Sequence, residues 1–250
     1  MERPTAVIIV AGGSGTRCGG SLPKQFRLLR NRPVLARTID RFATALRGAE
    51  LVVVLPEAYI PFWRDFSARF EVAHHTVAAG GSERFHSVRK GLEALRSEPE
   101  LIAVHDAVRP FASDELIRRV AAEAACSGAA IPALPPVDSF RAVEAAGSGS
   151  HIVDRSRLRI VQTPQIFRAD WLQQAYDTPF DARFTDDASV VEAAGHSVQL
   201  VEGERMNLKL TTPDDFAIAE ALLAAREAQD NEEEEDDTRP AAAPESDEKA

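Results

Sequence analysis

Apolar residues in this chain follow two alternating patterns. Short runs rich in β-branched residues predict buried strands, and between them apolar positions recur at helical spacing, as over 85–95 and over 116–124 behind an N-cap candidate at Ser113. Such alternation predicts an α/β fold whose mostly parallel sheet carries helices on both faces. The predicted strands are Ala6–Val10, Leu51–Leu55, Val72–Val77, Leu101–His105, Ala129–Leu134, Arg159–Gln162 and Val198–Val201.

Two later segments open helices, and one region departs from the pattern. Thr185-Asp-Asp-Ala begins one helix and Thr212-Pro213 another, with proline at the first helical position. Residues 135–157 alternate charged, small and β-branched side chains around a Gly-Ser-Gly-Ser turn and predict a protruding β-hairpin. Because an exposed hairpin of this length is marginally stable alone, we expect it to pack on a partner, most simply a second subunit.

The charge of the chain is concentrated at one end. Of the net −10, ten acidic and two basic residues at 230–250 contribute −8, which leaves the body nearly neutral. We therefore predict a folded domain over 1–229 and a disordered acidic tail over 230–250, with an acidic docking segment as the alternative for the tail. A nearly neutral body does not indicate binding to nucleic acid or to a membrane surface.

Composition also narrows the cellular setting. No apolar run approaches the roughly eighteen residues of a transmembrane helix, and the first residues show no leader pattern. Two cysteines, Cys18 and Cys126, without a CxxC motif exclude a disulfide framework and a cysteine-rich zinc site. A reducing cytoplasm fits this composition.

The first predicted strand leads into a glycine-rich turn with two cations nearby. Ala11-Gly-Gly-Ser-Gly-Thr-Arg17 is followed by Pro23-Lys24-Gln25, and it matches neither a Walker A loop nor a dinucleotide fingerprint. Backbone amides of such a turn can wrap an anion, and Arg17 with Lys24 suits a triphosphate attacked at its α-phosphorus. The alternative is a tight turn carrying two solvated bases.

Three further segments carry candidate chemistry. Residues 79–87 form a second glycine turn that could admit a base or ribose, although a plain helix-leading turn is an equal alternative. Asp106 directly follows a buried strand, where a carboxylate can hold Mg²⁺ against phosphates or merely cap a turn, whereas His105 is interpreted as structural. The chain has only four lysines, so Lys209, between Leu208 and Leu210, is interpreted as held over an anionic ligand rather than extended to solvent.

Taken together, six ordered motifs between residues 5 and 226 resemble those of the 2-C-methyl-D-erythritol 4-phosphate cytidylyltransferases, a family of the non-mevalonate isoprenoid pathway. They are the glycine turn with Pro23-Lys24-Gln25, His105-Asp-Ala-Val-Arg-Pro110, Asp154-Arg155, Gln162-Thr-Pro-Gln165, Thr185-Asp-Asp-Ala-Ser189 and Asn207-Leu-Lys-Leu-Thr211. The resemblance implies a Rossmann-like nucleotidyltransferase domain, a hairpin that acts as a dimerisation arm, and a divalent cation, Mg²⁺, at Asp106.

The resemblance also implies roles for individual residues. Arg17 and Lys24 match the groups that stabilise the transition state at the α-phosphate. Arg155, from the partner subunit's arm, and Lys209 match the pair that grips methylerythritol phosphate. The positions that match CTP-binding residues are Ala11, Gly12, Gly13, Gly15, Gly81, Ser82 and Ser87, and those on the substrate side are Asp106, Arg109, Ser139, Thr163 and Thr185. Ser139 and Arg141 stand where threonine and lysine are usual, and they keep the hydroxyl and the positive charge.

The reaction that this resemblance implies is transfer of CMP from CTP to 2-C-methyl-D-erythritol 4-phosphate with release of pyrophosphate. The incoming phosphate is already anionic at pH 7, so the reaction needs no general base, and the motifs offer no convincing one. Alternatives are a ribitol-5-phosphate cytidylyltransferase, a sugar-1-phosphate nucleotidyltransferase and a non-catalytic nucleotide-binding regulator. The chain has no Asp-x-His metal motif, so the cyclodiphosphate synthase activity that is fused to this enzyme in some bacteria is not expected.

Overall fold

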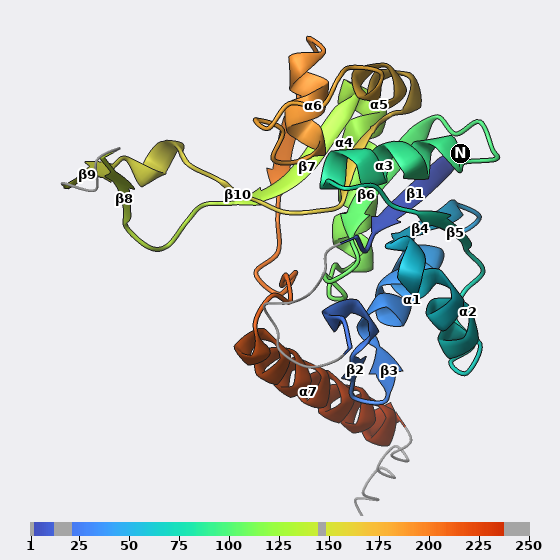
Figure 1. Ribbon diagram of the computed structural model, residues 1–250. Coiled ribbons are helices and arrows are strands. Elements are labelled where there is room, and N and C mark those ends of the chain that lie inside the picture. Colours follow the sequence, from blue (N-terminus) through green and yellow to red (C-terminus); the bar gives the residue numbers. More distant parts are fainter. Residues whose placement is uncertain (1–2, 13–21, 145–148, 238–250) are drawn as a thin grey trace, which may run out of the picture.

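The computed structural model describes residues 3–12, 22–144 and 149–237, with side chains described up to residue 225. One mixed, mostly parallel sheet forms the centre, in the order β10-β7-β11-β6-β1-β4-β5, with β12 paired to β7 (Figure 1). Its strands are β1 (Thr5–Val10), β4 (Glu50–Leu55), β5 (Thr76–Ala79), β6 (Leu101–Asp106), β7 (Ala129–Leu134), β10 (Ile160–Val161), β11 (Gln165–Arg168) and β12 (Gln199–Glu202).

Strand β1 lies parallel between β4 and β6, so its side chains are buried on both faces. Val7 and Ile9 point into a core with α1 and α4, whereas Ala6 and Ile8 join a second core with α3, α5 and α6. Burial on both faces explains why this strand is a continuous apolar run. The prediction of helices on both faces of a mostly parallel sheet is confirmed.

Seven α-helices connect the strands of the described chain. They are α1 (Val34–Ala45), α2 (Ile60–Ser67), α3 (Arg84–Glu93), α4 (Asp114–Ser127), α5 (Ala169–Tyr176), α6 (Asp187–Ala193) and α7 (Pro213–Asp237). Ser113 caps α4 by accepting a hydrogen bond from the Leu116 amide, as predicted. The Thr185 motif also opens a helix, where Asp186 and Ser189 form a capping box at the start of α6. None of the described helices is long and apolar enough to span a bilayer.

Short elements complete the chain and mark two differences from the predicted strands. They are the 3₁₀ turns η2 (Lys24–Phe26), η3 (Glu57–Tyr59) and η4 (Arg155–Arg157), and the pair β2 (Leu28–Leu29) and β3 (Arg32–Pro33). Strand β5 begins at Thr76 instead of Val72, because the Ala73 amide donates to Asp40 Oδ1 at 3.0 Å and not to a neighbouring strand. Strand β11 was not predicted, and it runs antiparallel between β6 and β7.

The predicted β-hairpin is present. Strands β8 (Phe140–Val143) and β9 (Ser150–Val153) pair antiparallel, and in Figure 1 they stand well away from the central sheet. Val143 is 73% exposed and Ile152 is 66% exposed. The hairpin therefore presents apolar side chains that the described residues leave uncovered.

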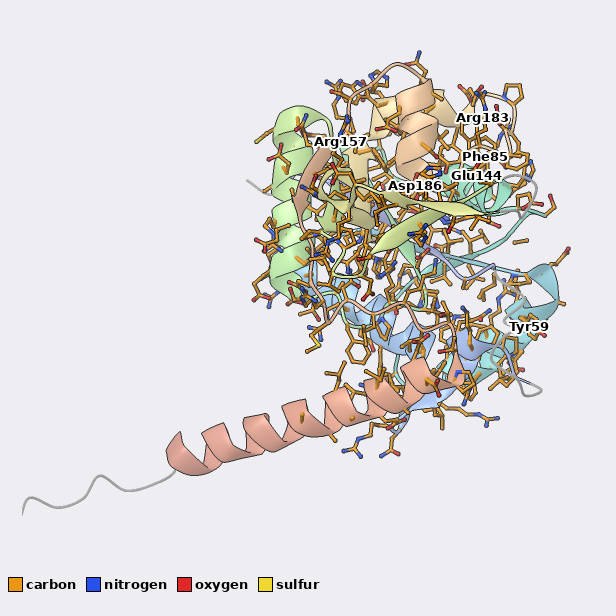
Figure 2. All side chains as sticks on the ribbon, turned by 90° about the vertical axis from the view of Figure 1, so that its left-hand side faces the viewer. Tyr59, Phe85, Glu144, Arg157, Arg183 and Asp186 are labelled. Atoms are coloured by element: carbon orange, nitrogen blue, oxygen red, sulfur yellow. The ribbon has the colours of Figure 1, made fainter. Side chains whose placement is uncertain are left out.

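The C-terminal helix extends past the predicted start of the tail. Helix α7 packs its first turns, through Phe216 and Ala219, on Leu29 and Leu210, and then continues to Asp237, past the rest of the protein in Figure 2. The backbone is helical over 230–237, and residues 238–250 lie outside the described residues. The division into a domain over 1–229 and a tail over 230–250 stays a prediction. Glutamate is a good helix former, so the acidic run can prolong a helix that tertiary packing has already started.

Candidate functional site

A cavity of about 450 Å³ opens at the carboxyl edge of the sheet, where β1 and β6 end. This is the edge at which open α/β sheets bind ligands. Its walls come from both glycine turns, from η2, from the end of β6 and from the segment before α7. The lining residues are Val10, Ala11, Gly12, Lys24, Gln25, Gly81, Ser82, Glu83, Arg84, Ser87, Asp106, Val108 and Lys209.

The first glycine turn begins directly after β1. The Gln25 amide donates a hydrogen bond to the Ala11 carbonyl at 3.0 Å, which ties the start of the turn to η2 and places Lys24 on the cavity wall. A Cβ on Gly12 would lie 3.1 Å from Ser87 Oγ, so the two glycine turns approach each other closely. Three predicted residues of this turn, Gly13, Gly15 and Arg17, lie outside the described residues.

The second glycine turn is held by its own side chains. A Cβ on Gly81 would lie 2.3 Å from the Cβ of His86, so only glycine fits there. Ser87 Oγ accepts a hydrogen bond from the Gly81 amide at 3.2 Å and donates one to the Glu83 carbonyl at 3.1 Å. Ser82 and Ser87, which are predicted to bind CTP, both line the cavity, and Ser87 also fixes the turn itself.

Asp106 is the last residue of β6, and within the described part of the chain three cationic side chains lie close to its carboxylate. Lys209 Nζ lies 2.9 Å from Oδ2, Arg109 Nε lies 3.3 Å from Oδ2, and Arg84 Nε lies 3.7 Å from Oδ1. Burial by itself would raise the pKa of Asp106, but Arg84, Lys209 and Arg109 outweigh it and hold that pKa well below its ordinary value. The carboxylate is therefore ionised and the Lys209 ammonium is brought to the cavity wall.

A buried hydrogen-bonded chain supports the backbone of Asp106 from behind. His105 Nε2 lies 3.0 Å from the Arg109 carbonyl, which can only accept, so Nε2 carries the proton. His105 Nδ1 then accepts from the Thr163 hydroxyl, whose oxygen in turn accepts from the Asp106 amide at 3.1 Å. Burial lowers the pKa of His105 to about 4, so the ring is neutral and structural, as the sequence analysis expects.

Several predicted substrate-side residues do not line the cavity. The Thr163 hydroxyl faces the interior, and Arg109 Nη1 donates to the Asn207 carbonyl at 2.8 Å while its Nε holds Asp106. Thr185 is exposed at the start of α6. Ser139 and Arg155 lie in the hairpin region, where Arg155 donates to the Val137 carbonyl.

Arg84 lines the cavity and was not singled out from the sequence. It stands inside the second glycine turn, next to Glu83, where a charged residue is unremarkable on a predicted helix start. The role of Arg84 depends on its contacts with Asp106 and with Asp187, and Asp187 follows Arg84 by 103 residues in the sequence. The acidic pair in the Thr185 motif was the only sequence signal for such a partner.

A metal ion at this site would have Asp106 as its carboxylate ligand and would take its other ligands from the substrates and from water. Among the described residues, no group of three or more His, Cys, Asp or Glu side chains could hold a metal. Arg84 Nε lies 3.7 Å from Asp106 Oδ1, beyond hydrogen-bond distance, so Arg84 leaves the lone pairs of this oxygen to a ligand. A single carboxylate fits Mg²⁺ that takes its other ligands from phosphates and water.

Comparison with known proteins agrees with this geometry. A family model described as 2-C-methyl-D-erythritol 4-phosphate cytidylyltransferase matches residues 5–225. The protein of that name from Bacteroides fragilis is 46% identical over 218 residues, which are 86% of this chain and 98% of that protein.

Solved structures give the same answer. The crystal structure of 2-C-methyl-D-erythritol 4-phosphate cytidylyltransferase from Thermus thermophilus is 36% identical, with a TM-score of 0.69 over 89% of this chain and 98% of that chain. The 4-diphosphocytidyl-2C-methyl-D-erythritol synthase structure from Anaerococcus prevotii is 26% identical, with a TM-score of 0.74 over 89% of this chain and 97% of that chain. The chain therefore belongs to the 2-C-methyl-D-erythritol 4-phosphate cytidylyltransferase family.

Proposed function

We propose that this protein transfers CMP from CTP to 2-C-methyl-D-erythritol 4-phosphate, giving 4-diphosphocytidyl-2-C-methyl-D-erythritol and pyrophosphate. The observation that carries the proposal is the cavity at the carboxyl ends of β1 and β6, where Lys24 and Lys209 face two glycine turns and Asp106. Backbone amides and ammonium groups in one cavity suit two polyanionic ligands that must approach each other.

The chemistry is a substitution at the α-phosphorus of CTP. A phosphate oxygen of methylerythritol phosphate forms the new P–O bond, and the bond to the β-phosphate breaks with its electron pair leaving on pyrophosphate. Because the attacking oxygen is already anionic, the protein has no proton to remove. Its residues position two anions and offset their repulsion.

Each cation has a role in this proposal. Lys24 and Arg17 stabilise the charge that builds on the α-phosphate oxygens in the transition state. Lys209 binds the phosphate of methylerythritol phosphate, and two glycine turns hold the nucleotide through Ala11, Gly12, Gly81, Ser82 and Ser87. Arg109 and Thr163 act on the substrate side through Asp106, whose carboxylate and backbone they hold.

We further propose that the divalent cation is Mg²⁺, held by Asp106 Oδ1 together with the phosphates of the ligands. Bound there, the ion would supply positive charge to the phosphate oxygens and so favour both substrate binding and departure of pyrophosphate. The neighbouring Arg84 and Arg109 keep the carboxylate ionised, which metal binding requires.

The hairpin is proposed to be a dimerisation arm. Val143 and Ile152 are exposed among the residues that the structure describes, and a second copy covers them by pairing its body against the arm. Arg155 follows the hairpin and does not line the cavity of its own chain among the described residues. In the homodimer it reaches the partner's site, where Ser139 and Thr185 also face the methylerythritol phosphate. A cytoplasmic location is proposed from the low cysteine content.

The proposed function is tested by pyrophosphate release with each of CTP, ATP, GTP and UTP against a panel of polyol and sugar phosphates. Release with CTP and methylerythritol phosphate alone is the expected result. Release with ribitol 5-phosphate in its place would indicate the related cytidylyltransferase, and release with a sugar 1-phosphate would indicate a sugar nucleotidyltransferase. No release with any pair would indicate a nucleotide-binding regulator and overturn the proposal.

A further inference from the structure

A second carboxylate lies behind the cavity wall, fully buried and bound by three hydrogen bonds. Asp187, the first residue of α6, has no exposed surface, and Arg84 Nη1 and Nη2 donate to its two oxygens at 2.8 and 2.7 Å. The Tyr176 hydroxyl, at the end of α5, donates to Asp187 Oδ1 at 2.7 Å. A buried carboxylate with this set of donors fixes the plane of the guanidinium group.

The elements that carry these partners are themselves anchored. Gln165 of β11 donates to Asp186 at 2.8 Å and accepts from the Ala188 amide at 2.9 Å, which locks the start of α6 to the sheet. The Tyr176 ring stacks on Phe85, the residue after Arg84, with centroids 4.7 Å apart. The groups that bind the Arg84 guanidinium are therefore themselves fixed, and Arg84 Nε lies 3.7 Å from Asp106 Oδ1.

The three cations around Asp106 differ in their freedom. Arg84 is tied to Asp187 and Arg109 is tied to the Asn207 carbonyl, whereas the Lys209 side chain is 45% exposed. If Lys209 turns to an incoming phosphate, Asp106 loses its closest partner while it remains buried. An unpaired buried carboxylate is costly, so the two fixed guanidinium groups are what allow Lys209 to change partner.

We propose that Arg84 is a positioning residue for the transfer reaction. Oriented by Asp187 and Tyr176, it keeps Asp106 paired and in place while Lys209 binds the phosphate of the substrate. This inference rests on the proposed function, because its main readout is the rate of CMP transfer. Helices α5 and α6 thereby gain a role in the site, although none of their described residues lines the cavity.

The test uses four single variants and one double variant of the full-length enzyme, together with chemical rescue. Arg84→Ala is expected to lower kcat about 100-fold, Arg84→Lys about tenfold, Asp187→Asn at least tenfold and Tyr176→Phe severalfold. Millimolar guanidinium chloride should restore part of the kcat of Arg84→Ala, because the Asp187 carboxylate can bind the free guanidinium ion through two hydrogen bonds. Guanidinium should not restore the kcat of the double variant Arg84→Ala/Asp187→Asn, because that variant lacks the carboxylate that would bind the ion.

A matched control separates positioning from general stability. Asp170→Asn removes a charge from another bidentate arginine–aspartate pair, Arg168–Asp170, which is exposed where β11 meets α5. This variant should keep kcat within twofold. If Arg84→Ala does not fold, Tyr176→Phe decides, since it removes one hydroxyl and keeps the ring on Phe85. Wild-type kcat in folded Arg84→Ala or in Tyr176→Phe, or a loss in Arg84→Ala without guanidinium rescue, would overturn the inference while leaving the proposed function intact. An inactive wild-type enzyme would overturn both.

Discussion

Acid should destabilise this protein through His105, well above the pH at which its carboxylates protonate. The ring is fully buried, donates to the Arg109 carbonyl and accepts from Thr163, an arrangement that only the neutral form satisfies. Burial lowers its pKa from an ordinary 6.5 to about 4. Between these two values the unfolded chain binds a proton at this position and the folded protein does not, so the free energy of unfolding falls as the pH falls.

The size of the effect follows from the shift. A difference of about 2.5 pKa units corresponds to roughly 3 kcal/mol once the pH is below both values, at about 1.4 kcal/mol per unit. At pH 5 the unfolded form is almost fully protonated and the folded form hardly at all, which gives a loss of about 2 kcal/mol relative to pH 7.5. Asp106 does not contribute in this window, because its lowered pKa costs stability only below its ordinary value of 3.8.

Urea unfolding of the wild type and of His105→Gln at pH 7.5 and pH 5 measures this directly. The variant will be less stable at both pH values, since it loses the ring contact with Phe42 at 4.6 Å. Its loss between pH 7.5 and pH 5 should nevertheless be about 2 kcal/mol smaller than that of the wild type. His75, whose pKa burial also lowers, contributes equally to both proteins and cancels, and His151→Gln in the exposed hairpin is the control. An equal pH dependence in wild type and His105→Gln would refute the assignment of the neutral buried ring.

Three further predictions concern turnover and the tail. Lys24→Ala and Arg17→Ala should each lower kcat about 100-fold, which corresponds to roughly 3 kcal/mol, with little change in KM. If steady-state rates show only a raised KM, the two side chains bind the phosphates of the ground state and do not stabilise the transition state. Mixing inactive Arg155→Ala subunits with inactive Lys24→Ala subunits should restore up to about half the wild-type rate per heterodimer, because one of the two shared sites is then intact. Heterodimers without activity would show that Arg155 acts in the site of its own subunit. Deletion of residues 230–250 should leave turnover and Tm nearly unchanged, because the acidic segment has no aromatic side chain to bury, and a large fall in Tm would show that it packs.

The sequence predicts the parts of this fold that depend on local pattern. Strands β1, β4, β6 and β7 are continuous apolar runs because both of their faces are covered, and their predicted bounds agree with the structure to within a residue. The four-residue β11 escapes such a pattern, since its place between β6 and β7 is fixed by pairing across the sheet. Local periodicity therefore finds the parallel centre and misses the short antiparallel insertion.

The candidate site divides in the same way. The motifs draw attention to Lys24, Ser82 and Asp106, and the structure places these three residues on one cavity. What the sequence does not reveal is which polar groups serve the site indirectly. Thr163 supports the backbone of Asp106 from the interior, and the task of Arg84 depends on contacts that only the folded chain creates.

The central claim is that the phosphate of methylerythritol phosphate attacks the α-phosphorus of CTP in this protein. Phosphorus NMR of purified enzyme with CTP, methylerythritol phosphate and Mg²⁺ tests it, because it follows the bond that forms as well as the one that breaks. The account predicts two mutually coupled resonances of a new diphosphate diester, with pyrophosphate in equal amount. Both products should accumulate about 100-fold more slowly with Lys24→Ala. Pyrophosphate that appears with CMP and unchanged methylerythritol phosphate would show hydrolysis instead of transfer and would contradict the account.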